Sequence, residues 1–139
     1  MKQINNIFKI SLFILLLALL LPLQSLAKSS IIETISPRQV ADLISQRNGD
    51  PNFIILDIRT PVEFKTGHLH NAVLLDYYSK IYLNELKRLD KTKTYLIYCR
   101  SGNRSGRSLG LIKKMGFQSV YNMGQGIIGW LKKGYKITK

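Results

Sequence analysis

The feature that most constrains the fold is the run Thr94–Arg107, in which an apolar segment passes directly into a short loop rich in small residues and arginine. Residues 95–98 are aromatic or aliphatic and are bounded by polar residues, which predicts a buried β-strand. Ser101, Gly102 and Asn103 follow, and these residue types accept the backbone angles of tight turns. The run therefore predicts a strand, a tight loop and a helix in immediate succession.

Cys99, the only cysteine of the chain, stands where this strand becomes the loop. A loop that opens a helix presents several backbone N–H groups to one point and adds the positive end of the helix dipole. Arg100, Arg104 and Arg107 add formal positive charge. Such surroundings lower the pKa of a thiol and hold a thiolate or a bound anion. Two interpretations stay open here: a reactive thiol, or a small buried apolar residue beside solvated arginines.

The first 27 residues have the three-part layout of a secretory signal peptide. Lys2 and Lys9 form a basic start, residues 10–23 are almost wholly apolar, and Ser25-Leu26-Ala27 ends the segment with small residues at a cleavage site. The apolar stretch of about 14 residues is shorter than the roughly 20 that a membrane-spanning helix needs. We therefore expect cleavage after Ala27 and a periplasmic or secreted protein, with an uncleaved membrane anchor as the alternative.

The expected mature chain, residues 28–139, is strongly basic. Two of the 21 lysines and arginines lie in the signal segment, so 19 remain against 8 acidic residues and the net charge is +11. Such a surface attracts anions, acidic partners or anionic membrane faces. No nucleic-acid recognition motif accompanies the charge, and export argues against a nucleic-acid partner. A membrane contact is expected only through an uncleaved signal segment.

Helical and strand patterns alternate along residues 28–139, whose length suits one domain. Residues 28–35 are interpreted as a short leader. Helices are expected from Ser36 to the turn at 48–52, from Thr60 to Gly67, and over 77–89, 103–115 and 127–133, and strands over 53–56, 72–75, 95–98 and 117–123. This alternation predicts an α/β fold with a mainly parallel central sheet flanked by helices on both faces.

Four local patterns together resemble the rhodanese homology domain, a sulfurtransferase-type α/β domain. In chain order they are Leu56-Asp57-Ile58-Arg59 followed by Glu63-Phe64; Gly67-His68-Leu69 leading to Ala72; Tyr98-Cys-Arg-Ser-Gly-Asn-Arg-Ser105; and Gly124-Gln-Gly-Ile-Ile-Gly-Trp130. The third pattern is specific and the others are weak alone. The resemblance covers about residues 36–136, the expected core of the domain.

The resemblance implies sulfur transfer. A cysteine thiolate takes a sulfane sulfur from a small anionic donor such as thiosulfate or polysulfide, becomes a persulfide, and passes the sulfur to a thiol or cyanide acceptor, a protein thiol included. Cys99 would be the catalytic nucleophile. The active-site loop would be formed by Arg100, Ser101, Gly102, Asn103, Arg104 and Ser105, with Asp57 and Arg59 as supporting residues. The family chemistry calls for no metal or organic cofactor.

Two alternatives to a sulfurtransferase stay open. Protein tyrosine phosphatases have a similar loop in which an arginine follows the cysteine after five residues; here Arg104 follows Cys99 after four, and Ser105 occupies the phosphatase arginine position. The shorter loop favours a smaller sulfur site. The other alternative is a non-catalytic rhodanese-like module that carries sulfur or binds a protein.

His68 and His70 are too few for a metal site.

Three further residues carry expectations of their own. Glu63 is predicted to be a capping or loop-bonding carboxylate, because it stands three residues after Thr60. Trp130 is expected to anchor the core. His70-Asn71 departs from the Pro-Gly pair that is usual in the family, which leaves the shape of this loop open.

Overall fold

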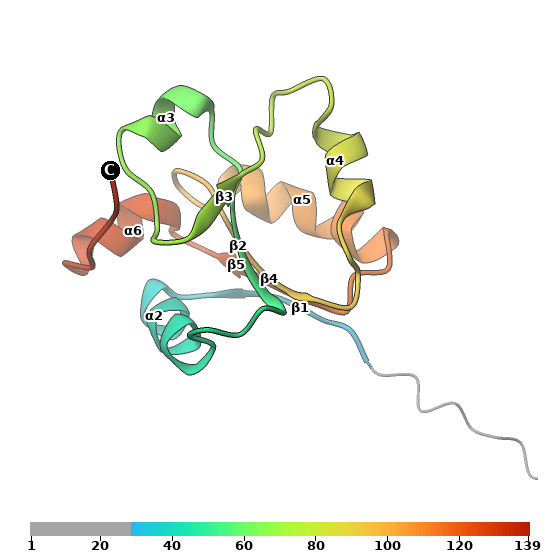
Figure 1. Ribbon diagram of the computed structural model, residues 1–139, viewed down its shortest axis with the longest axis horizontal. Coiled ribbons are helices and arrows are strands. Elements are labelled where there is room, and N and C mark those ends of the chain that lie inside the picture. The colour runs from blue at the N-terminus through green and yellow to red at the C-terminus, as the bar shows by residue number, and fades with distance from the viewer. Residues whose placement is uncertain (1–28) are drawn as a thin grey trace, which may run out of the picture.

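The structure is a computed structural model that describes residues 29–139; the predicted signal peptide and its cleavage site lie outside the described residues. Five strands form one parallel sheet in the order β1-β5-β4-β2-β3 (Figure 1). The strands are β1 (Ile31–Ile35), β2 (Phe53–Asp57), β3 (Ala72–Leu74), β4 (Thr94–Tyr98) and β5 (Ser119–Met123). The helices are α2 (Pro37–Gln46), α3 (Pro61–Lys65), α4 (Tyr82–Arg88), α5 (Asn103–Lys114) and α6 (Gly126–Lys132).

The central strand of the sheet is β4, all of whose residues are buried. It pairs with β2 on one edge and β5 on the other. Its side chains alternate between two core clusters, with Tyr95 and Ile97 on one face and Leu96 and Tyr98 on the other. A strand covered on both faces must be apolar along its whole length, which explains the continuous apolar run seen in the sequence.

Helices cover both faces of the sheet, which confirms the predicted architecture. Leu86 of α4 and Ile112 of α5 join one core cluster, while Val40 of α2 and Trp130 of α6 join the other. Figure 1 shows α4 and α5 to the right of the sheet and α2 and α6 to its left. Trp130 is the core anchor that the sequence predicted, with 8% of its surface exposed. Within residues 29–139, no helix is both long and apolar enough to cross a bilayer.

Two helices begin at the capping residues that the sequence indicates. The Ser36 hydroxyl accepts the backbone N–H of Gln39 at 3.4 Å, and the Thr60 hydroxyl accepts that of Glu63 at 3.3 Å. In return, each of the third helical residues accepts the N–H of its cap, so both α2 and α3 begin with a capping box. The predicted capping role of Glu63 is confirmed.

The interpretation of residues 28–35 as a leader is wrong, because Ile31–Ile35 form strand β1. This strand lies parallel to β5, with Ile31 opposite Ser119 and Ile35 opposite Met123. Its sequence, Ile-Ile-Glu-Thr-Ile, is rich in β-branched residues, which favour strands. As an edge strand it is only partly buried, so it lacks the continuous apolar run that revealed β2 and β4.

The helix predicted over 77–89 begins later, at Tyr82. The Asp76 carboxylate accepts the backbone N–H of Tyr78 at 3.0 Å, and the Ser79 hydroxyl accepts that of Ile81 at 3.3 Å. Such side-chain bonds to the local backbone compete with helix formation. They hold residues 76–81 as a turn that leads into α4.

Candidate active site

Cys99 follows β4 directly and lies at the carboxyl edge of the sheet, where parallel α/β folds place their ligands. The residue is fully buried, with 0% of its surface exposed. Its Sγ accepts the backbone N–H of Gly102 at 3.2 Å and the hydroxyl of Ser105 at 3.4 Å. The thiol therefore sits in a cradle made by the loop and by the first turn of α5.

Opposing effects act on the pKa of the Cys99 thiol. Burial is the largest single effect and raises the pKa, because it penalises the charged form. The Ser105 hydroxyl and the backbone N–H groups of Ser105, Ser101 and Gly102 all lower it. Together these hydrogen bonds outweigh burial, so the pKa is lowered and the thiolate is favoured.

Gly102 allows the loop to pack directly on the connection between β5 and α6. Its φ is +87°, in the left-handed region. A Cβ atom at this position would lie 2.0 Å from the carbonyl oxygen of Gly124. Both the conformation and the close approach therefore require glycine.

The first turn of α6 holds the backbone of the Cys99 loop. The N–H groups of Ile127 and Ile128 donate to the carbonyl oxygens of Cys99 and Arg100 at 3.0 and 3.1 Å. In a trans peptide the C=O and the following N–H point in opposite directions. Fixing these two carbonyls toward α6 therefore turns the N–H groups of Arg100 and Ser101 away from it. A Cβ atom on Gly126 would lie 2.5 Å from each carbonyl oxygen, so the close approach depends on glycine here too.

Arg104 forms a two-pronged ion pair with Glu63 of α3. Its Nη1 donates to Oε2 at 2.8 Å and its Nη2 to Oε1 at 2.7 Å. The guanidinium also lies over the ring of Tyr78, 5.6 Å from the centroid. The bond from Arg104 is the main cause that lowers the pKa of Glu63 to about 2. An anionic donor would therefore share Arg104 with a carboxylate, a pairing that the sequence did not indicate.

The remaining predicted loop residues differ in their exposure. Ser105 is buried beside the thiol, whereas Arg100, Ser101 and Asn103 are exposed. The loop thus contributes its backbone and the Ser105 hydroxyl to the sulfur, and Arg100 stands at the surface.

Asp57 and Arg59, the predicted supporting residues, form a buried ion pair at the end of β2. The Asp57 carboxylate accepts Nε of Arg59 at 2.9 Å and Nη2 at 2.6 Å. Nη2 also donates to the carbonyl oxygen of Gly67 at 2.7 Å. The guanidinium lies 5.7 Å from the ring centroid of Tyr98, the residue before Cys99. This pair ties β2 to the loop after α3 and borders the site through Tyr98.

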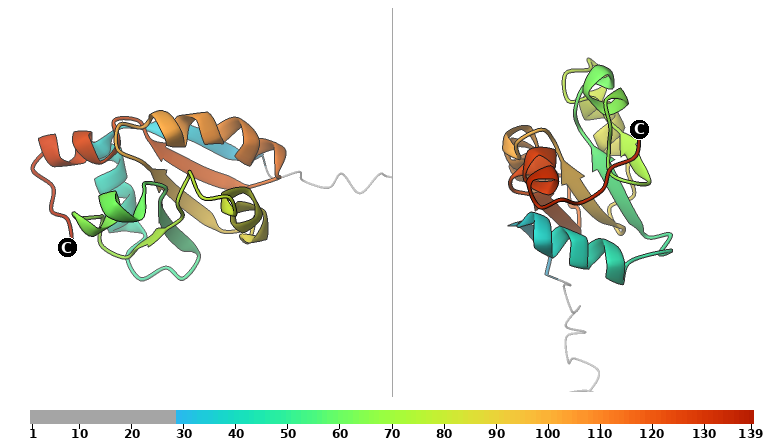
Figure 2. Two further views of the ribbon diagram at one scale, coloured as in Figure 1. Left: turned by 90° about the horizontal axis from the view of Figure 1, so that it is seen from above. Right: turned by 90° about the vertical axis from the view of Figure 1, so that its left-hand side faces the viewer.

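The two histidines lie on the loop between α3 and β3. The His68 ring stacks on Phe64, with 3.8 Å between the ring centroids. The His68 backbone pairs with Thr138 of the C-terminal tail, which runs from α6 toward α3 in Figure 2. Asn71 has a φ of +60°, a conformation that asparagine accepts more readily than most residues, so the departure from Pro-Gly is accommodated. Across residues 29–139, no group of three or more His, Cys, Asp or Glu side chains could hold a metal ion.

The family model of the rhodanese-like domain matches residues 37–133. The chain belongs to the rhodanese-like family. This rhodanese-like chain is 33% identical over 99 residues to a protein named sulfurtransferase from Allochromatium vinosum, across 70% of this chain and 91% of that protein. It is 31% identical over 103 residues to the probable adenylyltransferase/sulfurtransferase MoeZ of Mycobacterium tuberculosis, across 72% of this chain and only 25% of MoeZ.

Solved structures agree with the rhodanese-like fold. A crystal structure of a rhodanese-related protein from Thermoplasma volcanium has a TM-score of 0.64 and 24% identity, and the match covers 76% of this chain and 97% of that chain. A rhodanese-like domain protein from Staphylococcus aureus has a TM-score of 0.62 and 23% identity, with 77% and 99% covered. At these identities the likeness shows the fold alone.

Removing the Ser105 hydroxyl should raise the pKa of Cys99, because the thiolate loses a hydrogen-bond donor that this rhodanese-like loop supplies. We expect Ser105→Ala to move the thiolate absorbance transition near 240 nm to higher pH, with Cys99→Ser as the blank. Ser108→Ala, one turn further along α5, is the matched control. Identical transitions in the Ser105 variant and the parent would contradict the assigned cradle.

Alanine substitutions at two glycines with similar φ values separate the cost of left-handed backbone strain from the cost of a steric clash. Gly102 and Gly116 have φ values of +87° and +82°, but a Cβ atom would collide only at Gly102. We expect Gly116→Ala to lower the free energy of unfolding by about 1–2 kcal/mol, from left-handed strain alone. Gly102→Ala should cost roughly 1–3 kcal/mol more, from overpacking. Urea unfolding measures both, and equal losses would show that the loop does not press on Gly124.

The ion pair between Glu63 and Arg104 predicts an acid-sensitive contribution to stability. The pKa of Glu63 is about 2 in the folded protein, against about 4.3 for an unperturbed glutamate. Because the folded-state pKa is the lower one, the contribution is present above about pH 4.3 and is lost as the pH falls toward about 2.

We expect the difference in free energy of unfolding between the parent and Glu63→Gln to shrink over this pH window. Urea titrations from pH 7 downward measure it, and Glu33→Gln, at an exposed position on β1, is the control. A difference that does not depend on pH would contradict the assigned ion pair.

Proposed function

We propose that the chain is a sulfurtransferase in which Cys99 carries the transferred sulfur as a persulfide. The observation that supports this most is the cradle around the single thiol, in which Gly102 N–H and Ser105 Oγ both donate to Sγ. The relatives named sulfurtransferase support the same reaction class.

The reaction has two displacement steps. In the first, the Cys99 thiolate attacks the sulfane sulfur of thiosulfate; the bond from Sγ to that sulfur forms, the S–S bond of thiosulfate breaks, and sulfite leaves with the electron pair. In the second, a thiolate or cyanide attacks the outer sulfur of the persulfide. The bond to Sγ then breaks, and the electron pair returns to Cys99 as the thiolate.

The same hydrogen bonds serve both steps. A lowered pKa increases the thiolate fraction for the first attack and makes Cys99 a better leaving group in the second. The donors are fixed by the loop and α5 before the reaction begins, so little reorganisation is needed as charge develops. Because Cys99 is 0% exposed, the atoms that cover Sγ must move before a donor reaches it.

The dimensions of the loop support sulfur over phosphate as the bound group. Only four residues separate Cys99 from Arg104, and Arg104 is already paired with Glu63. A phosphate group needs a wider cradle and an arginine free to hold two of its oxygens.

We further propose that residues 1–27 direct export and are removed after Ala27; a mature mass that still includes them would contradict this.

Thiocyanate formation from thiosulfate and cyanide tests the proposed reaction. We expect the purified protein to form thiocyanate, and Cys99→Ala to lose at least about a hundredfold of the rate, because the nucleophile is gone. Intact mass should show the gain of one sulfur atom after thiosulfate and its loss after cyanide. A generic phosphatase substrate assayed in parallel should show no turnover.

Two results would oppose the proposal. A protein with reduced Cys99 that gains no sulfur from thiosulfate or polysulfide would favour the binding-module alternative. Cys99-dependent phosphate release would favour a phosphatase. The circular dichroism spectrum of Cys99→Ala shows whether this variant is folded, and so whether its loss of activity comes from the missing thiol.

A further inference from the structure

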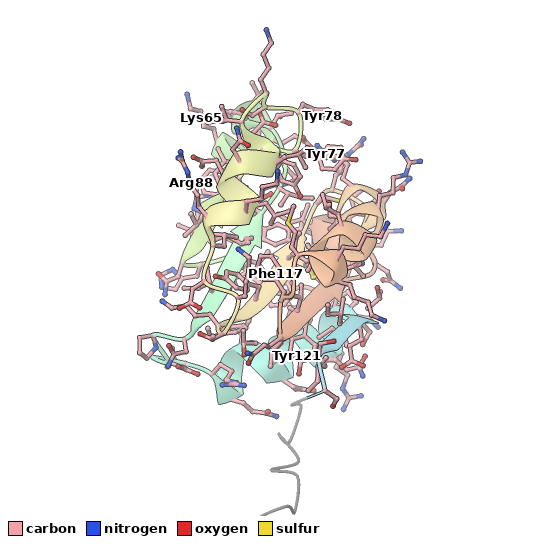
Figure 3. The ribbon with its side chains drawn as sticks, turned by 90° about the vertical axis from the view of Figure 1, so that its right-hand side faces the viewer. Lys65, Tyr77, Tyr78, Arg88, Phe117 and Tyr121 are labelled. Carbon is pink, nitrogen blue, oxygen red and sulfur yellow. The ribbon has the colours of Figure 1, made fainter. Side chains whose placement is uncertain are left out.

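A pocket of about 360 Å³ lies between α5 and the segment that leads into α4. Tyr77, Tyr82 and Leu111 supply apolar lining, and Lys80, Arg107 and Ser108 supply polar groups. The volume lies in the range of small-molecule sites. Figure 3 faces this side of the molecule and shows Tyr77 and Tyr78 at the end of α4 that lies toward Lys65.

The pocket begins about one helical turn from the thiol. Ser105 touches Sγ, and Ser108 stands three residues further on the same face of α5, which corresponds to a rise of about 5 Å. The Tyr82 hydroxyl lies 3.0 Å from that of Ser108, and both residues line the pocket. Tyr78, beside Tyr77, lies over Arg104 of the Cys99 loop. A ligand in the pocket therefore lies about one helical turn from Ser105, whose hydroxyl donates to Sγ of Cys99.

The cations of this pocket are free to meet a ligand. Within residues 29–139, the ion pairs are Arg47–Asp50, Arg59–Asp57 and Arg104–Glu63, so neither Lys80 nor Arg107 has an acidic partner there. Both side chains are exposed, and no carboxylate lines the pocket. Arg104, by contrast, is neutralised by Glu63. Two positive charges without an acidic partner among the described residues therefore lie at the pocket, besides that of Arg100 on the Cys99 loop.

We infer that this pocket binds the sulfur acceptor, and that the acceptor is an elongated thiol whose carboxylates lie away from its sulfur. Lys80 and Arg107 would hold the carboxylates, while Tyr77, Tyr82 and Leu111 contact the chain between them and the thiol. This inference rests on the proposed sulfur transfer and names the chemical class of its acceptor.

The transfer at this site balances without a further reagent. The acceptor gives its thiol proton to solvent, and its thiolate attacks the outer sulfur of the Cys99 persulfide. A new S–S bond forms on the acceptor, the bond to Sγ breaks, and Cys99 is released as the thiolate. The product is the acceptor hydropersulfide.

Acceptor kinetics test the pocket. Thiosulfate is the donor, and the acceptors are glutathione, glutathione diethyl ester, which has the same thiol with its carboxylates masked, and cyanide. In Lys80→Ala/Arg107→Ala we expect the ratio of kcat/KM for glutathione to that for the diester to fall about tenfold. Arg38→Ala/Lys132→Ala removes the same charge from exposed positions on α2 and α6, across the sheet, and should keep the ratio.

Binding without chemistry gives a second measurement. We expect S-methylglutathione to bind the Cys99→Ser protein in calorimetry, with a Kd about tenfold higher when Lys80 and Arg107 are replaced. If thiocyanate forms while the pocket variant changes neither the ratio of kcat/KM values nor the Kd of S-methylglutathione, that result would contradict the proposed acceptor site and leave the proposed sulfur transfer intact. If no acceptor gains sulfur, the proposed function fails, and S-methylglutathione binding that depends on Lys80 and Arg107 still shows an anion pocket.

Discussion

The close seating of the Cys99 loop on the β5–α6 connection is the interaction on which the site depends. Two N–H groups of α6 hold the carbonyl oxygens of Cys99 and Arg100, and two glycines let the chains approach. Because a peptide plane is rigid, fixing those carbonyls also fixes the direction of the neighbouring N–H groups. The short helix α6, far from Cys99 in sequence, therefore sets the backbone of the sulfur cradle.

This cradle resolves a conflict between burial and charge. Full burial opposes ionisation of Cys99, but hydrogen bonds from the loop and Ser105 more than compensate. The arginines beside the cysteine contribute less than the sequence indicated, because Arg104 is paired with Glu63 and Arg100 is exposed. Two further cations without an acidic partner among the described residues, Lys80 before α4 and Arg107 on α5, line a pocket rather than the thiol.

Local patterns in the sequence were enough to predict the α/β class, the strand–loop–helix at Cys99 and the capped starts of α2 and α3. Each of these depends on residues within a few positions of one another, such as the apolar run of β4 or the spacing from Thr60 to Glu63. The two errors of the sequence-based prediction also have local causes. The edge strand β1 is only partly buried and has a faint pattern, and side-chain bonds from Asp76 and Ser79 delay α4.

Contacts between distant segments needed the tertiary structure. Glu63 and Arg104 each stood out in the sequence, but 41 residues separate them, and no periodicity indicates that their charges meet. The same holds for the close approach of Gly126 to the carbonyl oxygen of Cys99 and for the pocket that Tyr82 and Ser108 line together. Sequence patterns report which face of an element is buried; the packing of whole elements decides which buried faces and which charges become neighbours.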